Sequence, residues 1–352
     1  MKKLDIEPKN IIVRMPNWIG DFIMATPILA ELRKKFPKAK ITAMCRQKMC
    51  CLLEKDKNID EIFCFQKENS FFSRRKEKKD IVKKLQAGKY DVGILLTNSF
   101  SSAGWFLLGG VKKRVGFRTE CRHLLLNMGV TLFKKQKQQH QVETYKSLLL
   151  PLGIGVSSFS SPPRLYVEEK EIQKAKQLLY QRGYKEGAYL IGINPGAAYG
   201  TAKCWLPERF KEVARRLIKE KNLFVVFFGD QKTSSLVKRI CRDLPFQVIN
   251  LAGLTTLREL MCVMHECNVV LTNDSGPMHM SDALNVPVVA IFGSTSETIT
   301  GPYQSGIVIN KHVSCSPCFK RTCSRDFSCM KSIEVDEVID KIKEQFYAKK
   351  NC

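Results

Sequence analysis

The sequence predicts an α/β protein made of two Rossmann-like domains that face each other across a cleft. Its 352 residues are too many for one ordinary core and suit two domains of about 150–180 residues each. Short β-branched runs alternate with helical patterns in both halves, which is typical of a parallel sheet with helices on both faces. A stretch rich in Gly, Ser and Pro, from Pro151 to Pro163, separates the two halves.

The first half contains five apolar runs that read as strands, with helical periodicity between them. The strands are expected at Ile11–Met15, Lys40–Met44, Ile59–Phe65, Tyr90–Thr97 and Arg114–Phe117. The helices are expected at Phe22–Phe36, Lys76–Leu85 and Ser101–Leu108. Pro37 ends the first of these helices, because proline cannot continue the hydrogen-bonding pattern.

The second half repeats this plan. Its strands are expected at Tyr189–Asn194, Leu223–Phe228, Val269–Thr272 and Val286–Phe292. Its helices are expected at Glu168–Tyr180, Pro207–Lys221, Thr256–His265, Pro277–Leu284 and Glu334–Phe346. The last helix has apolar residues at 335, 338, 339 and 342, which form one helical face. The expected division is therefore 1–165, 166–332 and a closing helix and tail at 333–352.

Composition excludes several classes of protein. With 44% hydrophobic and 26% charged residues, the chain is globular rather than disordered. No run approaches the roughly 18 apolar residues that a membrane span needs. The N-terminal lysines are not followed by an apolar segment, so no secretory signal is expected. We therefore expect a cytoplasmic protein whose 14 cysteines are mostly reduced rather than a disulfide framework.

The positive charge is concentrated in the first half of the chain. Residues 1–165 contain 32 Lys and Arg against 14 Asp and Glu, whereas residues 166–352 contain 26 against 20. A basic field on one domain attracts anionic partners, such as phosphorylated substrates, acidic lipid headgroups or nucleic acid. Only three tryptophans and no aromatic RNA-binding motif are present, so no nucleic-acid partner is expected.

In sheets of this kind, ligands bind at the carboxyl ends of the strands, which points to the loops 16–21, 195–203, 229–231 and 273–279. The segment Thr272–His279 runs from a strand into a helix that Pro277 opens. Free N–H groups of Ser275, Gly276 and Met278 would cradle a diphosphate there. The simpler alternative is an ordinary helix cap by Asp274 or Ser275, with His279 as a packing residue.

The loop Asn194–Lys203 is the second candidate for phosphate binding. Gly196 and Gly200 allow close approach of the backbone, and Lys203 offers a point charge to a phosphate oxygen. The alternative is a plain strand-to-helix turn with a surface lysine, since such turns are commonly rich in glycine. Asp230, just after the next strand, stands where a carboxylate could hold ribose hydroxyls.

Asp21 follows the first strand and lies at the start of a helix, where the helix dipole stabilises a carboxylate. At the mouth of a cleft between the domains, it could accept a proton from an acceptor hydroxyl. The alternative is a charge at a helix N-terminus with no chemical task.

Four cysteines stand close together at Cys315, Cys318, Cys323 and Cys329. Such a set could hold zinc or an iron–sulfur cluster. Structural zinc sites usually carry two separated Cys-x2-Cys pairs, and this segment has one. We therefore prefer a loop of reduced thiols and expect no bound metal.

Taken together, these segments resemble the ADP-heptose lipopolysaccharide heptosyltransferases, glycosyltransferase family 9, from Ile11 to about Ile342. IIVRMPNWIGDFIMATPIL resembles the first βα unit of the family, with Asp21 at its acidic position, and INPGAAYGTAKCWLPERF resembles its donor loop. LAGLTTLRELMCVMHECNVVLTNDSGPMHMSDAL is the most specific match. CSPCFKRTC resembles the heptosyltransferase II branch in particular.

The resemblance implies a GT-B fold and an inverting transfer of heptose from ADP-heptose to a heptosyl-Kdo2-lipid A type acceptor in the inner core of lipopolysaccharide. Asp21 would be the general base, and Lys203 would stabilise the departing ADP without metal or other cofactor. The residues implied for donor binding are Ala197, Ala198, Lys203, Asp230, Asp274, Ser275, Gly276, Met278 and His279. Asp230 stands where the family has a glutamate.

The same resemblance places the anionic acceptor on the N-terminal domain, in agreement with the charge distribution. The acceptor contacts expected there are Arg46, Arg114, Arg118 and Arg122. Peripheral contact with the inner leaflet of the inner membrane of a Gram-negative bacterium is compatible with such a lipid acceptor. Two alternatives remain open from the residues: a GT-B glycosyltransferase with another nucleotide-sugar donor, and a basic protein that binds polyanions without chemistry.

Overall fold

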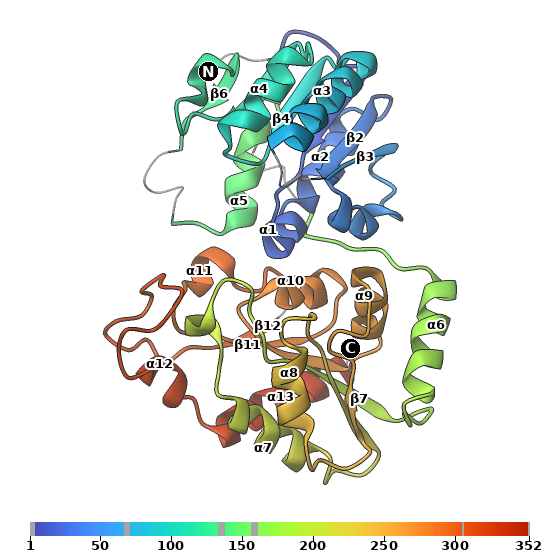
Figure 1. The fold of residues 1–352 in the computed structure, drawn as a ribbon, viewed down its shortest axis with the longest axis vertical. Helices are drawn as coiled ribbons and strands as arrows, with labels where there is room; N and C mark the ends of the chain where they lie inside the picture. The colour runs from blue at the N-terminus through green and yellow to red at the C-terminus, as the bar shows by residue number, and fades with distance from the viewer. Residues whose placement is uncertain (1–3, 67–70, 133–137, 156–160, 305, 351–352) are drawn as a thin grey trace. The chain divides into compact units, whose positions relative to one another are not determined.

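The computed structural model describes residues 4–66, 71–132, 138–155, 161–304 and 306–350. The chain divides into two compact units, Met1–Arg164 and Leu165–Cys352. Each unit contains a six-stranded parallel sheet with helices packed on it (Figure 1). The predicted fold class, two α/β domains of Rossmann type, is confirmed. The segment Pro151–Pro163 expected as a linker lies partly outside the described residues, at 156–160.

The first sheet has the strand order β3-β2-β1-β4-β5-β6. Its strands are β1 (Asn10–Arg14), β2 (Lys40–Arg46), β3 (Glu61–Phe65), β4 (Val92–Leu95), β5 (Lys113–Phe117) and β6 (Met128–Val130). The central strand β1 pairs with β2 through Ile12 and Thr42 and with β4 through Ile12 and Gly93. Because β1 has neighbours on both sides, its apolar run is almost wholly buried.

Helices cover both faces of this sheet. They are α1 (Ile19–Met24), α2 (Thr26–Lys35), α3 (Phe71–Gly88), α4 (Phe100–Leu108) and α5 (Gln141–Lys146). Ile81 and Leu85 of α3 share one core with Phe106 of α4. The single helix expected at Phe22–Phe36 is wrong, because the structure has two helices joined at Ala25. The reason is Pro27, which lacks an N–H group and so occupies the first turn of a new helix.

The second sheet has the order β12-β11-β10-β7-β8-β9. Its strands are β7 (Tyr189–Asn194), β8 (Leu223–Phe227), β9 (Val248–Asn250), β10 (Val269–Asn273), β11 (Val288–Ile291) and β12 (Gly306–Ile309). Strands β6, β9 and β12 were not expected from the sequence, because runs of three or four residues carry too little periodicity to identify. All three lie at sheet edges.

The helices of the second unit also lie on both faces of their sheet. They are α6 (Glu169–Tyr180), α7 (Pro207–Leu217), α8 (Ser234–Cys241), α9 (Leu257–His265), α10 (Gly276–Ala283), α11 (Glu297–Thr300), α12 (Ser328–Lys331) and α13 (Val335–Lys350). The closing helix α13 buries Val338 and Ile342 in the same core as Trp205, so it is packed against the second sheet. The predicted apolar face of this helix is confirmed.

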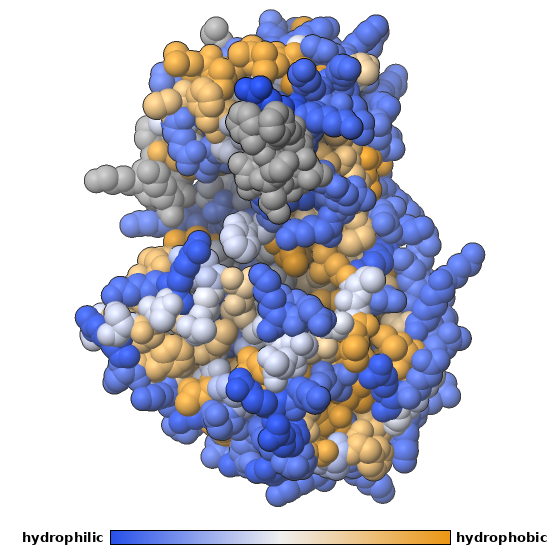
Figure 2. All heavy atoms as spheres, in the orientation of Figure 1, coloured by the Kyte–Doolittle hydropathy of each residue, from blue (hydrophilic) through white to orange (hydrophobic). Residues whose placement is uncertain are grey.

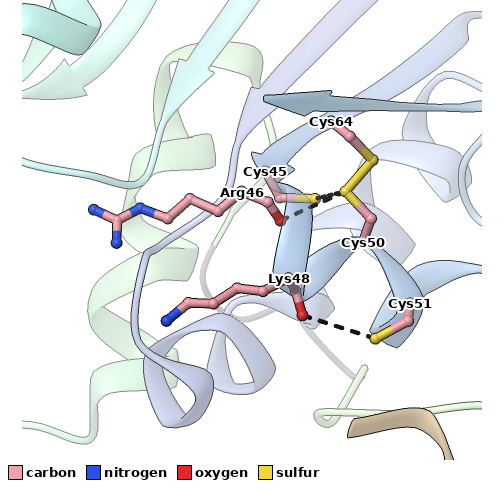
Figure 3. Close-up of a disulfide and its surroundings, with 6 residues drawn as sticks. All are labelled: Cys45, Arg46, Lys48, Cys50, Cys51 and Cys64. Carbon is pink, nitrogen blue, oxygen red and sulfur yellow. Dashed lines mark hydrogen bonds between the residues drawn. A yellow bond between two sulfur atoms is a disulfide. The ribbon is translucent and has the colours of Figure 1, made fainter. Parts of the chain in front are cut away.

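A disulfide joins Cys50 and Cys64 in the described part of the first unit and lies beside the thiol of Cys45 (Figure 3). It joins the 3₁₀ helix Gln47–Leu53 to β3. The expectation of reduced thiols is therefore wrong for this pair, which the fold brings within bonding distance although 14 residues separate them. Cys262 and Cys267 are buried in the core of the second unit. Among the described residues, no helix is both long enough and apolar enough to cross a membrane.

Candidate functional site

Lys203 and Asp274 form the centre of the candidate site in the second unit. The donor loop, residues 195–203, follows β7 and ends in a 3₁₀ turn, Thr201–Lys203. Lys203 Nζ lies 2.5 Å from Asp274 Oδ2, and the Thr295 hydroxyl donates to the same oxygen at 2.6 Å. The two charged side chains are only 14% and 4% exposed. The lysine is thus held at the carboxyl edge of the sheet by a partner that balances its charge.

Two asparagines fix the donor loop to the strand β10. Asn273 donates to the carbonyl of Pro195 at 2.8 Å and accepts from the Trp205 N–H at 2.9 Å. Asn194 donates to the carbonyl of Gly196 at 2.9 Å and lies 3.2 Å from the Ser275 hydroxyl. Because both amides are buried and hydrogen-bonded, they hold the loop on either side of Lys203.

The N-terminus of α10 differs in one respect from the predicted phosphate cradle. Ser275 precedes the helix, and its side chain makes no capping bond. The Met278 N–H donates to the carbonyl of Ser275 at 3.1 Å, so the expectation that this group is free is wrong. The tight first turn that Pro277 opens accounts for that bond. Within the described chain, the N–H groups of Ser275 and Gly276 have no intramolecular acceptor.

The remaining residues predicted to bind the donor lie at the same edge of the second sheet. Met278 and His279 are buried on the first turns of α10, and Ala197 and Ala198 are on the donor loop. Asp230 is exposed, but its carboxylate accepts from both the N–H and the hydroxyl of Thr233 at 2.9 Å. Asp230 therefore stabilises the turn before α8, and its contact with ribose stays a prediction.

In the first unit, Asp21 lies in the first turn of α1, after the carboxyl end of β1. It is half-buried and hydrogen-bonded to the phenol of Tyr145, which comes from α5. Burial raises the pKa of Tyr145 well above its ordinary value, and the negative charge of Asp21 raises it further. Gln141 also bonds the phenol oxygen, so the tyrosine donates its proton to Asp21 and orients the carboxylate.

Two of the four arginines expected to contact the acceptor make hydrogen bonds within the first unit. Arg122 is fully buried and donates to the carbonyls of Thr97 and Phe117, at the ends of β4 and β5. Arg114 lies near the start of β5 and donates to the carbonyls of Leu125 and Val111 at 2.8 and 2.7 Å. Burial lowers the pKa of both guanidinium groups. Both guanidinium groups already satisfy backbone carbonyls of the first unit, and their expected role in acceptor binding stays a prediction.

The other two arginines remain available for a ligand. Arg118 follows β5 and is exposed, and Arg46 ends β2 and is half-buried. The buried guanidinium of Arg14 lies close enough to Arg46 to be influenced by its charge. Burial, together with the charge of Arg46, lowers the pKa of Arg14 to about 9.

We call residues 315–329 the cysteine loop. Its four cysteines are free thiols, and they line one cavity together with Ala202 and Ser294. Burial raises the pKa of Cys329, and the neighbouring Cys315, Cys323 and Cys318 raise it further. The described residues contain no group of three or more His, Cys, Asp and Glu side chains arranged to hold a metal ion. The expectation of no bound metal stays a prediction.

Sequence reasoning missed several residues of this site. Thr295 comes from the segment after β11 and meets Asp274 only in the folded chain. Tyr199 lies beside Lys203, and Arg321 contacts the Tyr199 ring although more than 100 residues separate these two along the chain. The asparagines at the ends of β7 and β10 were visible as polar residues that interrupt apolar strands, and this pattern could have identified them.

Comparison with known proteins identifies the relatives of this chain. The model of glycosyltransferase family 9 (heptosyltransferase) matches residues 79–327. Lipooligosaccharide heptosyltransferase 2 of Haemophilus ducreyi is 31% identical over 310 residues, which are 85% of this chain and 88% of that protein. Lipopolysaccharide heptosyltransferase 2 of Escherichia coli K12 is 30% identical over 299 residues, 83% of this chain and 85% of the relative.

Solved structures agree with these relatives. The structure of E. coli ADP-heptose lipopolysaccharide heptosyltransferase II matches with a TM-score of 0.83 and 28% identity, over 97% of this chain and 99% of that one. A family 9 glycosyltransferase from Veillonella parvula matches with a TM-score of 0.87 and 26% identity, over 98% and 99%. The expected GT-B fold is confirmed.

Proposed function

This chain belongs to glycosyltransferase family 9, the heptosyltransferases, and from that premise we propose that it transfers heptose from ADP-L-glycero-D-manno-heptose to the inner core of lipopolysaccharide in a Gram-negative bacterium. The acceptor is of the heptosyl-Kdo2-lipid A type. Relatives named heptosyltransferase 2 match at 28–31% identity over 83–95% of the chain, which supports this choice. The donor binds the C-terminal unit, and the acceptor binds the basic N-terminal unit.

The observation that carries the proposed donor site is the position of Lys203 beside α10. The lysine is fixed by Asp274, and the Ser275 and Gly276 N–H groups on the adjoining segment have no acceptor in the described protein. An ammonium group and unpaired N–H groups at a helix N-terminus are suited to the diphosphate of ADP. As the bond from the anomeric carbon to the β-phosphate oxygen breaks, these groups stabilise the charge that develops on that oxygen.

Asp21 supplies the base for a single in-line displacement. The acceptor oxygen forms a bond with the anomeric carbon, ADP leaves from the opposite side, and the configuration inverts. The hydroxyl proton passes to the Asp21 carboxylate, which the Tyr145 phenol holds in one orientation. A carboxylate oriented by a buried tyrosine on α5 supports this role better than a helix-terminal charge in open solvent would.

The N-terminal unit also offers a surface for the membrane that carries the acceptor. Five lysines of α3 are exposed, at Lys76, Lys78, Lys79, Lys83 and Lys84. The neighbouring helix α4 exposes three large apolar side chains, at Phe100, Leu107 and Leu108. Gln86 of α3 donates to the carbonyl of Leu108 at 3.1 Å, so the two helices adjoin. Figure 2 shows apolar atoms beside hydrophilic ones at the end of the unit where Figure 1 draws α4.

We define Phe100, Leu107, Leu108 and the five lysines as the α3–α4 surface. Lysines attract acidic headgroups. Exposed leucine and phenylalanine side chains lower their free energy by leaving water for the boundary between headgroups and acyl chains. We propose that this surface makes peripheral contact with the cytoplasmic leaflet of the inner membrane.

Titration calorimetry with ADP, ADP-heptose, UDP and GDP, without added metal, tests the donor assignment. We expect binding of the two adenine nucleotides and little binding of the others, followed by turnover with heptosyl-Kdo2-lipid A. A preference for UDP or GDP would retain a glycosyltransferase and reject heptose as the sugar. Failure of all four to bind would reject the donor site and favour a basic polyanion-binding protein.

A further inference from the structure

Tyr199 contacts two cations beside the proposed donor site. Lys203 Nζ lies 5.1 Å from the centroid of the tyrosine ring, and the guanidinium carbon of Arg321 lies 5.2 Å from the same centroid. Both distances are within the range of a cation–π interaction. The Tyr199 hydroxyl donates to the carbonyl of Phe319 at 3.0 Å, which holds the ring against the cysteine loop.

Backbone contacts bind the donor loop to the cysteine loop at the same place. The Ala202 N–H donates to the carbonyl of Arg321 at 3.0 Å. A Cβ atom on Gly200 would lie 2.2 Å from that carbonyl oxygen, so only glycine permits this approach. The Phe319 N–H donates to the carbonyl of Ser294 at 2.7 Å, which ties the cysteine loop to the segment after β11. Arg321 is therefore placed by backbone contacts on both sides rather than by its own flexible side chain.

The proposed donor site needs more positive charge than Lys203 supplies, and Arg321 is a nearby cation without an ionic partner among the described residues. Lys203 already forms an ion pair with Asp274, so the carboxylate offsets the positive charge that the lysine offers to a ligand. The diphosphate of ADP carries more than one negative charge and needs further cations when no metal accompanies it. The exposed guanidinium of Arg321 makes no hydrogen bond or ion pair with any described residue, and its one observed contact is the ring of Tyr199.

We propose that Arg321 is a further donor-binding residue that contacts the diphosphate of the nucleoside diphosphate, and that Tyr199 is a positioning residue that holds Lys203 and Arg321 together. This inference rests on the proposed donor site. Guanidinium is the side-chain group best matched to two phosphate oxygens at once, which an ammonium group cannot bridge in the same way.

Calorimetric titration of wild type, Arg321→Gln and Lys320→Gln with ADP and with AMP tests the role of Arg321. Lys320 is the matched control, because it is an exposed cation on the same loop whose ammonium bonds Ser324. We expect Arg321→Gln to lower the affinity for ADP by about tenfold or more, which is the usual contribution of a charge-assisted hydrogen bond. The affinity for AMP, which lacks the second phosphate, should fall much less in Arg321→Gln. Lys320→Gln should change the affinity for either nucleotide by less than about threefold.

Equal effects of Arg321→Gln and Lys320→Gln on ADP would overturn the role of Arg321 while leaving the donor site intact. If wild-type protein binds no ADP, the proposed function fails first and this inference fails with it. Circular dichroism of each variant verifies that the fold is retained, and a variant that loses the fold is replaced by Arg321→Lys. That substitution keeps the charge but cannot bridge two oxygens, so it should restore only part of the ADP affinity.

The role of Tyr199 is separated from simple packing by comparing Tyr199→Phe with Tyr199→Leu. Phenylalanine keeps the ring under both cations and loses only the bond to Phe319, whereas leucine removes the ring. We expect the leucine variant to lose about tenfold in kcat/KM and the phenylalanine variant to recover most of that loss. Equal losses in the two variants would overturn the positioning role of the ring.

Discussion

Lys203 Nζ and Asp274 Oδ2 lie 2.5 Å apart, and the same carboxylate oxygen also accepts a hydrogen bond from the hydroxyl of Thr295. Three segments therefore meet at one oxygen: the donor loop, the end of β10 and the segment after β11. Asp274 has little water around it, so its remaining interactions are strong and directional. The ammonium group of Lys203 is consequently fixed before any ligand arrives, which is the condition for stabilising charge that develops during a reaction.

Replacing Lys203 by methionine should lower kcat by about 10²–10³-fold, the usual effect of removing one preorganised group that stabilises a leaving oxygen. The measurement is heptosyl transfer at saturating donor and acceptor. Lys232→Met, at an exposed lysine of the same unit, is the control and should change kcat by less than about twofold. A loss of less than tenfold for Lys203→Met would reject this role.

Asp21→Asn should lower kcat by at least about 10²-fold, because asparagine cannot accept the proton of the acceptor hydroxyl. Donor affinity should remain unchanged, since Asp21 belongs to the N-terminal unit. Calorimetry with ADP and steady-state transfer assays measure the two quantities separately. Asp80→Asn, at an exposed carboxylate of α3, should have wild-type turnover. If Asp21→Asn loses tenfold or less with donor binding intact, Asp21 is not the base.

Asp91 should make the stability of the first unit depend on pH. Its carboxylate accepts from the N–H groups of Lys9 and Asn10 at 2.9 and 3.0 Å and pairs with Lys112 at 3.0 Å. Burial acts to raise the pKa of Asp91, but the bonds with Lys112 and these amides outweigh it and lower the pKa. Since the folded-state pKa lies below the unfolded value of about 3.9, this stabilisation is present above that pH and is lost as the pH falls through the folded pKa.

Asp91→Asn should therefore cost about 1–3 kcal/mol of unfolding free energy at pH 7, the price of weakening bonds to a charged acceptor. The difference from wild type should shrink as the pH falls below the unfolded-state value of about 3.9, and it should disappear once the pH is below the folded-state pKa of Asp91. Urea unfolding at pH 7, 5, 4 and 3 measures it. A difference that stays constant over this range would contradict the assignment of the pH dependence to this carboxylate.

Trp205 should be a major source of stability for the second unit. It is almost fully buried, its ring packs edge-on against Phe210 at 5.0 Å, and its indole N–H donates to the carbonyl of Ile333 at 3.2 Å. Trp205→Ala should lower the free energy of unfolding by about 3–5 kcal/mol. Trp18→Ala, at an exposed tryptophan, should change it by less than about 0.5 kcal/mol. Urea unfolding measures both, and similar losses would refute the prediction.

The α3–α4 surface should bind acidic vesicles. Wild-type protein is expected to sediment with vesicles that contain phosphatidylglycerol and weakly with vesicles of phosphatidylcholine alone. Leu107→Gln with Leu108→Gln should reduce binding at least about fivefold, because apolar area no longer enters the interface. Leu254→Gln, at an exposed leucine of the second unit, is the control. Equal binding by the double variant and wild type would place the membrane contact elsewhere.

The sequence was sufficient to predict the fold class and to select the edge of the second sheet at which the candidate site lies. Strand β7 and the loop after it were visible because an apolar run ends in Pro195 and Gly196, and this change of pattern is local. The bonding of Arg122 could not be predicted, because its partners are backbone carbonyls of Thr97 and Phe117, which no local pattern connects to it. The contact of Tyr199 with Arg321 was invisible for the same reason. Local chemistry indicates which residues are polar, but only the tertiary structure shows which of them are already paired.

The close approach of Gly200 to the carbonyl of Arg321 also limits how this protein can be re-engineered. A chimera that receives only the donor loop of a relative would place foreign side chains against a native cysteine loop shaped for glycine at that position. Residues 195–206 and 315–329 therefore form a single module for grafting, although they are far apart in the chain. Exchanges of donor specificity should be designed by moving both segments together.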